Sequence, residues 1–400
     1  MRERVMHGFP PPADTQVTLA NWRTSPFNRW AFQHVREILP TADIPHDPTA
    51  VRELSLRPVA LERLQITGAN GKALTLEQAL EATSTDGLVV LHKGAIVLER
   101  YFNGMTQRSP HILMSISKSL LGLIAGVLVG QGVLNVTRLV TDVIPEIKNT
   151  AWAQATVMQL LDMRTGVAFN EDYLAASGPI IAYRKAAGWN PLGPGEEPSD
   201  LRAFLRELRQ VDGPHGGRFC YVSPNTDLLG WLIERVSGKR YADLVSELLW
   251  QPIGAADSGY ISVDRLGAPR AAGGICATTR DLARVGQMLI EGGVHRGRQV
   301  VPASWLDMIA NDGDPEAWAA GNLASYYPGI PIHYRAKWYV ERSVPRVLFC
   351  LGIHGQNLFV DGKHNLVIAK FSSQPAPLDV ASITLTGELV RALRQELSDA

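Results

Sequence analysis

The apolar residues near both ends of the chain follow the pattern of β-hairpins. Two apolar runs predict strands over about 88–92 and 95–102, and Gly94 between them supplies the positive φ that a tight hairpin turn requires. Two further apolar segments flank Gly362 and predict a second hairpin near the carboxyl end. The chain is therefore expected to contribute strands from both of its ends.

The apolar spacing in the middle of the chain is that of helices. Three stretches with apolar residues three and four apart stop at Gly166, Gly238 and Gly254, and glycine is a common residue at a helix C-terminus. The same spacing predicts helices over 278–293 and 382–397. Helices thus separate the two groups of strands.

A continuous apolar run from Leu120 to Gly130 follows a short polar segment that begins at Ser115. This run contains too many apolar residues for a helix with one exposed face, so we expect the helix to lie between two layers of the fold. It is also well short of the roughly 20 residues that a membrane-spanning helix needs.

These elements predict an α+β fold, an α/β sandwich in which strands from both ends of the chain form one sheet flanked by helices. Residues 81–145 and 262–400 would form the α/β lobe, residues 146–261 a mostly helical lobe, and residues 1–80 an N-terminal arm with the leading elements. The region 168–217 is rich in glycine, proline and charge and is predicted to be a long, functional loop. A cleft between the lobes is the expected place for a site.

Charge and cysteine content exclude several classes of function. The 400 residues include 39 Lys and Arg against 39 Asp and Glu, so the chain lacks the excess positive charge that nucleic acids and anionic membranes attract. Its three cysteines are far apart and form no CxxC pair, which argues against a disulfide framework or a zinc site. The first residues contain no apolar signal core, so we expect a cytoplasmic protein with no nucleic-acid or membrane partner.

The first candidate for chemistry is the S-x-x-K tetrad formed by Ser115 and Lys118, at the start of the apolar helix. Positions three apart share a helix face, so the hydroxyl and the amine can meet. A serine becomes a good nucleophile when a neighbour removes its proton, and a lysine in a dry site can be neutral enough to do so. The alternative is an exposed serine and lysine at a helix start.

The second candidate is Tyr221, which stands just before a predicted helix. A tyrosine phenol held near a lysine could carry a proton to the leaving group. Asn225, four residues further, could hydrogen-bond the substrate or fix the lysine. The same Ser-Pro-Asn stretch also suits a helix cap, and the two roles are compatible.

The third candidate is the segment from Gly352 to Gln356, where glycines allow a ligand to approach the backbone closely. A backbone N–H there could pair with that of Ser115 as an oxyanion hole. His354 could instead act as a base for Ser115, although no well-placed aspartate singles itself out to orient it.

The order of these elements resembles the β-lactamase-related serine hydrolases, which include penicillin-binding proteins and esterases. The resemblance covers about residues 80–373 and includes the stretches TVMQLLDMRTG, YVSPNTD, LLWQPIGAADS and AAGGICATTRDLARVG. It implies an antiparallel sheet flanked by helices, with a helical lobe and no cofactor. The family's Lys-Thr-Gly strand motif is replaced here by Leu-Gly-Ile-His, which disfavours strong β-lactamase activity.

The resemblance also implies roles for individual residues. Ser115 would be the nucleophile, Lys118 the base and Tyr221 the proton shuttle, with the N–H groups of Ser115 and Ile353 as the oxyanion hole. Substrate contacts are implied for three side chains besides Asn225, namely Tyr173, Trp338 and His354.

We therefore expect a serine hydrolase that cleaves a small linear amide or ester through an acyl-enzyme. A carboxylesterase with little amidase activity, a β-lactamase or D-Ala-D-Ala peptidase, and an inactive binding protein remain as alternatives. The resemblance to an amide-cleaving member of the family implies an acidic residue where this chain has Arg184 and Lys185, so a cationic substrate end would meet like charge. A homodimer is left open.

Overall fold

The centre of the protein is an antiparallel sheet built from both ends of the chain. The computed structural model describes residues 5–61, 63–68 and 71–398. Within these ranges the sheet has seven strands in the order β11-β12-β13-β14-β15-β4-β5. Their bounds are β4 (Thr85–His92), β5 (Ala95–Tyr101), β11 (Ile332–Arg335), β12 (Trp338–Glu341), β13 (Val347–Gly352), β14 (Gln356–Asp361) and β15 (Leu366–Ser372). Both predicted hairpins are confirmed, as β4–β5 and β14–β15.

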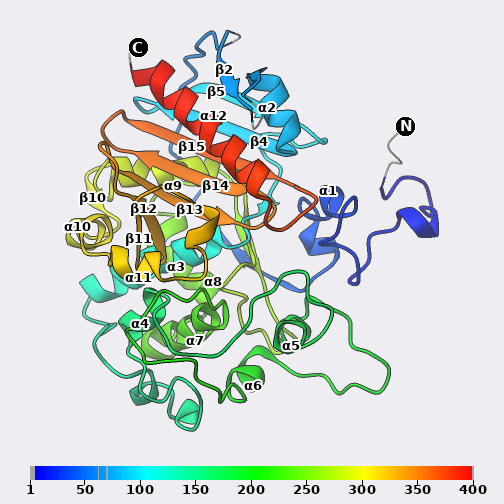
Figure 1. The fold of residues 1–400 in the computed structure, drawn as a ribbon, viewed down its shortest axis with the longest axis vertical. Helices are drawn as coiled ribbons and strands as arrows, with labels where there is room; N and C mark the ends of the chain where they lie inside the picture. The colour runs from blue at the N-terminus through cyan, green and yellow to red at the C-terminus, as the bar shows by residue number, and fades with distance from the viewer. Residues whose placement is uncertain (1–4, 62, 69–70, 399–400) are drawn as a thin grey trace.

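Helices cover both faces of this sheet (Figure 1). On one face α12 (Val380–Ser398) and α2 (Leu76–Ala82) pack over the strands, and on the other lie α3 (Ile116–Gly130) and α9 (Thr279–Ile290). The alternation of β4 explains the two cores, because Leu88 and Val90 face α12 while Val89 and Leu91 face the opposite layer. The α+β sandwich predicted from the sequence is confirmed.

The apolar helix α3 lies between layers, as predicted. Its residues from Ile116 to Leu128 are buried, and it contacts β13 and β14 on one side and α7 (Pro224–Ser237) and α8 (Tyr241–Val245) on the other. Since Ser115 directly precedes α3 and Lys118 lies in its first turn, this packing places them at the junction of the sheet and the helical lobe.

The N-terminal arm has regular structure of its own. It contains α1 (Asn28–Ala31) and the short helices η1 (Ala13–Thr15) and η2 (Val35–Glu37), and its strand β1 joins a second sheet in the order β1-β7-β8-β6. The partner strands are β6 (His111–Ile112), β7 (Gly259–Ser262) and β8 (Ile275–Ala277), with β1 at Thr41–Ile44. This sheet ties the arm to the chain just before Ser115.

The helical lobe fills the lower part of Figure 1. The region 168–217 is not one long loop, because it contains the two helices α5 and α6. A proline at the start of α5 and an Asp200 cap at the start of α6 begin helices that the glycine-rich composition concealed. The lobe comprises η3 (Val140–Asp142), η4 (Pro145–Ile147), α4 (Val157–Leu161), α5 (Pro179–Ala186), α6 (Leu201–Leu205), α7, α8 and η5 (Ser246–Trp250).

The remaining elements surround the sheet. They are β2 (Gln65–Thr67), β3 (Ala73–Thr75), β9 (Val294–His295), β10 (Arg298–Gln299), α10 (Ala303–Asn311), α11 (Pro315–Ala319) and η6 (Ala324–Tyr326). Among the helices in the described ranges, none combines the length and apolar character required to cross a bilayer.

Candidate active site

Ser115 stands immediately before the first residue of α3, at a sharp turn of the backbone. The preceding residue, Met114, has a φ of 46°, a left-handed conformation that is unfavourable for a side chain other than glycine. Close packing holds the helix in place behind it, because a Cβ on Gly122 would lie 2.1 Å from the carbonyl oxygen of Ala336. The turn therefore presents Ser115 at the front of a rigid helix.

Lys118 is in contact with the hydroxyl of Ser115. Its Nζ lies 2.8 Å from Ser115 Oγ and 2.6 Å from the carbonyl oxygen of Ala272. Burial lowers the pKa of Lys118 to about 7, helped by the charge of Arg270 and opposed by Glu171. A large fraction of this amine is therefore neutral near pH 7 and can accept a proton.

Tyr221 completes the arrangement that the sequence predicted. The centroid of its ring lies 4.9 Å from Lys118 Nζ, and Ser115 is near enough to its phenol to oppose the rise of its pKa. Burial, followed by the negative charge of Glu171, raises the pKa of Tyr221, so the phenol keeps its proton at neutral pH. The backbone N–H of Tyr221 donates to Asn322 Oδ1 at 2.9 Å, which fixes the residue before α7.

Glu171 connects two parts of the site and was missed in the sequence. Its carboxylate accepts the backbone N–H of Ser223 at 2.6 Å and the hydroxyl of Tyr173 at 2.9 Å. It therefore holds the segment that follows Tyr221 against the loop that carries Tyr173. The stretch Asn-Glu-Asp-Tyr is visible in the sequence, but only its tyrosine was recognised there.

A buried ion pair supports the other side of Lys118. Asp227 on α7 pairs with Arg270 and accepts both the hydroxyl of Tyr183 and, at 2.8 Å, the N–H of Ala272. Since the carbonyl of Ala272 accepts the hydrogen bond from Lys118, this network positions the lysine. No spacing in the sequence indicates it, because its members are brought together only by the tertiary fold.

The turn from β13 to β14 lies against the chain that leads into Ser115. A Cβ on Gly352 would come within 2.6 Å of the carbonyl oxygen of Leu113, so only glycine permits this approach. Ile353, the first residue of the turn, lines the same cavity as Ser115. In the part of the chain that the structure describes, no main-chain acceptor is found for the N–H of either Ser115 or Ile353. This arrangement suits a pair of oxyanion donors.

Two predicted substrate contacts lie away from the cavity. Trp338 is fully buried at the start of β12, and its Nε1 donates to the carbonyl of Ser119 at 3.1 Å, behind α3. Asn225 is also fully buried, and its amide accepts from Trp152 Nε1 at 2.7 Å and donates to Thr165 Oγ1 at 2.8 Å. Both expectations are corrected here, because these polar groups satisfy buried neighbours.

His354 is the third predicted contact that the structure does not bring to the cavity. Its Nδ1 bonds the carbonyl of Gln374 at 2.7 Å, and its ring packs edge-on against Phe32 at a centroid distance of 5.2 Å. Burial lowers the pKa of His354 to about 4, so the ring is neutral at pH 7. It shapes the turn that carries Ile353 and makes no contact with Ser115 that would suit a base.

The two basic residues of α5 have different surroundings. Arg184 is buried and donates to the carbonyl of Tyr173 at 3.1 Å, directly behind a residue that lines the cavity. Lys185 instead pairs with Glu196 at 2.5 Å on the surface. Of these two residues, Arg184 is therefore the one whose charge lies close behind the cavity at Tyr173.

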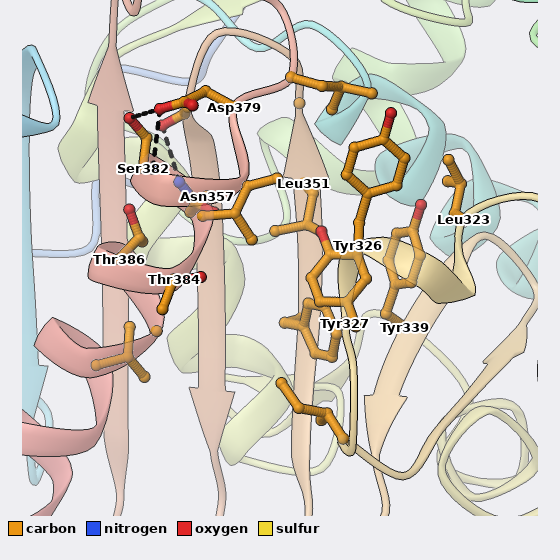
Figure 2. A pocket seen from close by; sticks show the side chains of 18 of the residues that line it. Leu323, Tyr326, Tyr327, Tyr339, Leu351, Asn357, Asp379, Ser382, Thr384 and Thr386 are labelled. Atoms are coloured by element: carbon orange, nitrogen blue, oxygen red, sulfur yellow. Dashed lines mark hydrogen bonds between the residues drawn. The ribbon is translucent and has the colours of Figure 1, made fainter. Parts of the chain in front are cut away.

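The predicted residues that the structure brings together line one cavity of about 360 Å³. Ser115, Tyr173, Tyr221 and Ile353 line one end of it. From there it extends over the outer face of β12–β14 between η6 and α12, where Figure 2 shows Tyr326 and Tyr339 opposite Ser382.

Comparison with known proteins decides the family. The profile of the family described as Beta-lactamase matches residues 73–390. A 6-aminohexanoate-dimer hydrolase from Paenarthrobacter ureafaciens is 36% identical over 370 residues, which cover 92% of this chain and 91% of the relative. The chain belongs to the β-lactamase family. It is a serine hydrolase.

Solved structures of this family share the fold. A Bacillus anthracis protein, named provisionally as a 6-aminohexanoate-dimer hydrolase, has a TM-score of 0.87 at 28% identity, over 96% of this chain and 98% of that one. A family VIII carboxylesterase gives 0.57 at 18% identity, over 79% of this chain and 96% of that one, and shows the fold alone. The β-lactamase family therefore accounts for the antiparallel sheet and the helices that flank it.

Proposed function

We propose that this protein hydrolyses a linear amide or carboxylic ester through an acyl-enzyme on Ser115. The observation that carries the proposal is the distance of 2.8 Å between Ser115 Oγ and Lys118 Nζ, in a site where burial brings the pKa of the lysine to about 7. Each partner has the chemical property that its role requires.

The first half of the reaction would form the acyl-enzyme. Neutral Lys118 accepts the proton of Ser115 as Oγ attacks the carbonyl carbon of the substrate. The N–H groups of Ser115 and Ile353 stabilise the oxyanion of the tetrahedral intermediate. Tyr221 then donates its proton to the departing nitrogen or oxygen and recovers a proton from Lys118 as the C–N or C–O bond breaks.

The second half would release the acid. Water attacks the ester of Ser115 as the neutral Lys118 accepts its proton, and the bond to Oγ breaks as this proton returns to the serine, directly or by relay through the Tyr221 hydroxyl. Every proton taken up in one step is returned in another, so this cycle consumes only substrate and water.

The proposed substrate class rests on the relatives and on one charge, that of Arg184, which disfavours a cationic substrate. The curated relative is named for cleaving the 6-aminohexanoate dimer, a linear amide, which supports linear substrates here. The buried Arg184 behind Tyr173 opposes a cationic group at that position, so the dimer itself is a poor candidate. An esterase with little amidase activity is the second candidate, because an ester leaving group needs less help from Tyr221.

One panel of substrates tests the proposal. A p-nitrophenyl ester, the 6-aminohexanoate dimer and a chromogenic cephalosporin are each assayed with the unmodified enzyme and with Ser115→Ala. We expect ester turnover that disappears in the variant, and no efficient cephalosporin turnover because Leu-Gly-Ile replaces the Lys-Thr-Gly motif at the end of β13. Turnover that survives in Ser115→Ala would remove this serine from the mechanism.

We also propose a reducing, cytoplasmic setting. Its support is that Cys220, Cys276 and Cys350 are all free thiols. Fractionation of the source cells with an antibody against the protein would test it, and recovery outside the cytoplasm would contradict it.

A further inference from the structure

The cavity at Ser115 continues as a groove with an aromatic floor. Tyr339, Phe349 and Phe359 come from β12, β13 and β14, and their registers place them side by side on the same face of the sheet. The rings of Tyr339 and Phe349 stack with centroids 5.2 Å apart, and those of Phe349 and Phe359 with centroids 5.7 Å apart. The floor is thus an apolar strip that leads away from the nucleophile.

The walls of the groove come from two distant parts of the chain. On one side lie Tyr326 and Tyr327 at the end of η6, and on the other lies α12, as Figure 2 shows. From Asp379, just before the helix, to Val390 the lining spans twelve residues, or about 16 Å. The groove is therefore long enough for an extended chain.

The charged side chains along the groove already have partners: the two arginines are in ion pairs, while Asp379 and Glu341 accept serine hydroxyls. Arg394 bonds Asp361 at 2.7 Å, and Arg391 at the rim pairs with Glu388 at 2.5 Å. Asp379 accepts the hydroxyl of Ser382 at 2.5 Å. An occupant with a charged chain would have to compete with these contacts, whereas an apolar chain would leave them intact and cover the aromatic rings.

We propose that this groove binds a long, uncharged apolar chain of the substrate. The preferred substrates are then amides or esters that carry an extended aliphatic or aryl-alkyl chain. This inference rests on the proposed function, since the groove is continuous with the cavity at Ser115. It adds a determinant of specificity that the catalytic residues do not supply.

The chain offers a position where the groove can be filled without a clash. Gly387 lines the groove on α12, and a Cβ built there meets no atom within 4 Å. Replacing a glycine inside a helix also raises helix propensity, so Gly387→Trp should fold. Its indole would occupy space that a long chain needs.

The experiment measures kcat/KM over two series of esters. One series lengthens the acyl chain from acetate to decanoate with a constant p-nitrophenol leaving group, and the other lengthens the alcohol of acetate esters. In the unmodified enzyme we expect kcat/KM to rise with chain length in one of the two series, which identifies the half of the substrate that occupies the groove. In Gly387→Trp the ratio of long-chain to short-chain kcat/KM should fall about tenfold, equivalent to about 1.4 kcal/mol or the burial of roughly two methylene groups.

A matched tryptophan provides the control. Glu396 is exposed on α12, nine residues further and so about 180° around the helix from Gly387, and it does not line the groove. Glu396→Trp should keep the chain-length dependence of the unmodified enzyme. A flat dependence in both series, or an equal effect of the two tryptophans, would overturn the groove proposal while short-ester turnover still supported Ser115 as the nucleophile.

The same variants test whether a second copy of the chain covers the groove instead. In that case Gly387→Trp would change the mass measured by analytical ultracentrifugation, and the long-chain preference would be absent. A constant mass together with the altered chain-length ratio supports a substrate chain as the occupant.

Discussion

At the scale of single residues, the proposed mechanism makes the reactivity of Ser115 depend on the protonation of Lys118. Because the pKa of Lys118 is lowered to about 7, the amine is charged and inactive as a base below this pH and neutral above it. We expect kcat/KM for a neutral ester to fall about tenfold per pH unit below pH 7. In Lys118→Met, activity should drop roughly 10²- to 10⁴-fold and the acid limb should disappear.

Lys370 provides the matched control for that pH profile. It is a second fully buried lysine whose pKa burial lowers to about 7, but it lies on β15 and donates to Ser372 Oγ. Lys370→Met should keep the acid limb of kcat/KM. If the limb vanished with Lys370 and persisted without Lys118, the assignment of the base would be wrong.

The phenol of Tyr221 should be needed most where the leaving group is poor. An amine must be protonated as it departs, whereas a nitrophenolate leaves unaided. Tyr221→Phe should therefore reduce amide hydrolysis at least about tenfold more than nitrophenyl ester hydrolysis. Tyr241→Phe, at a buried tyrosine on α8, is the control; equal losses on both substrates in Tyr221→Phe would contradict a role at the leaving group.

The charge of Arg184 should select against cationic substrates. Removing it in Arg184→Ala should raise the ratio of kcat/KM for an ammonium-bearing linear amide to that for its uncharged analogue by about tenfold. The neighbouring Lys185→Ala should leave the ratio unchanged, because that lysine is paired with Glu196 at the surface. The ratio is informative even if loss of the bond to Tyr173 lowers both rates.

At the scale of elements, what the sequence predicted well is local. The hairpins at Gly94 and Gly362 and the buried helix after Ser115 follow from periodicity and turn chemistry within a few residues. The S-x-x-K contact is equally local. By contrast, Asn225 lies on the predicted helix, yet its side chain turns to Trp152, a partner 73 residues away that no pattern in the sequence indicates.

The packing of α3 predicts which of its glycines are essential for stability. A Cβ on Gly126 would lie 2.3 Å from the ring of Trp305, whose Nε1 donates to the carbonyl of Gly122 at 3.0 Å. Gly126→Ala should lower the free energy of unfolding by about 1–3 kcal/mol in urea titrations. Gly387→Ala, where space is open, should instead raise it by up to about 1 kcal/mol, and similar losses in both variants would contradict this packing argument.

At the scale of the whole molecule, the site exists only where distant segments converge. The proposed nucleophile stands just before α3 and the tyrosine just before α7. The carbonyl that accepts from the lysine belongs to Ala272, and the turn with the proposed oxyanion donor joins β13 to β14. Helix α12, the last element of the chain, walls the groove over the sheet. Catalysis and global stability should therefore be coupled through the turn between β13 and β14 that carries Ile353.

His354 makes this coupling measurable. Its pKa is lowered from 6.5 to about 4, chiefly by burial, so the folded protein resists a proton that the unfolded chain binds. The contribution of this neutral histidine to the free energy of unfolding is fully present above pH 6.5 and is lost as the pH falls toward 4. A pKa lowered from 6.5 to about 4 corresponds to about 3 kcal/mol in the free energy of unfolding. Urea titrations between pH 7 and pH 4 should show the free energy of unfolding falling more steeply for the unmodified protein than for His354→Leu, whatever the absolute stability of the variant. If the free energy of unfolding fell equally with pH in both proteins, the buried ring of His354 would not be the source of the acid sensitivity.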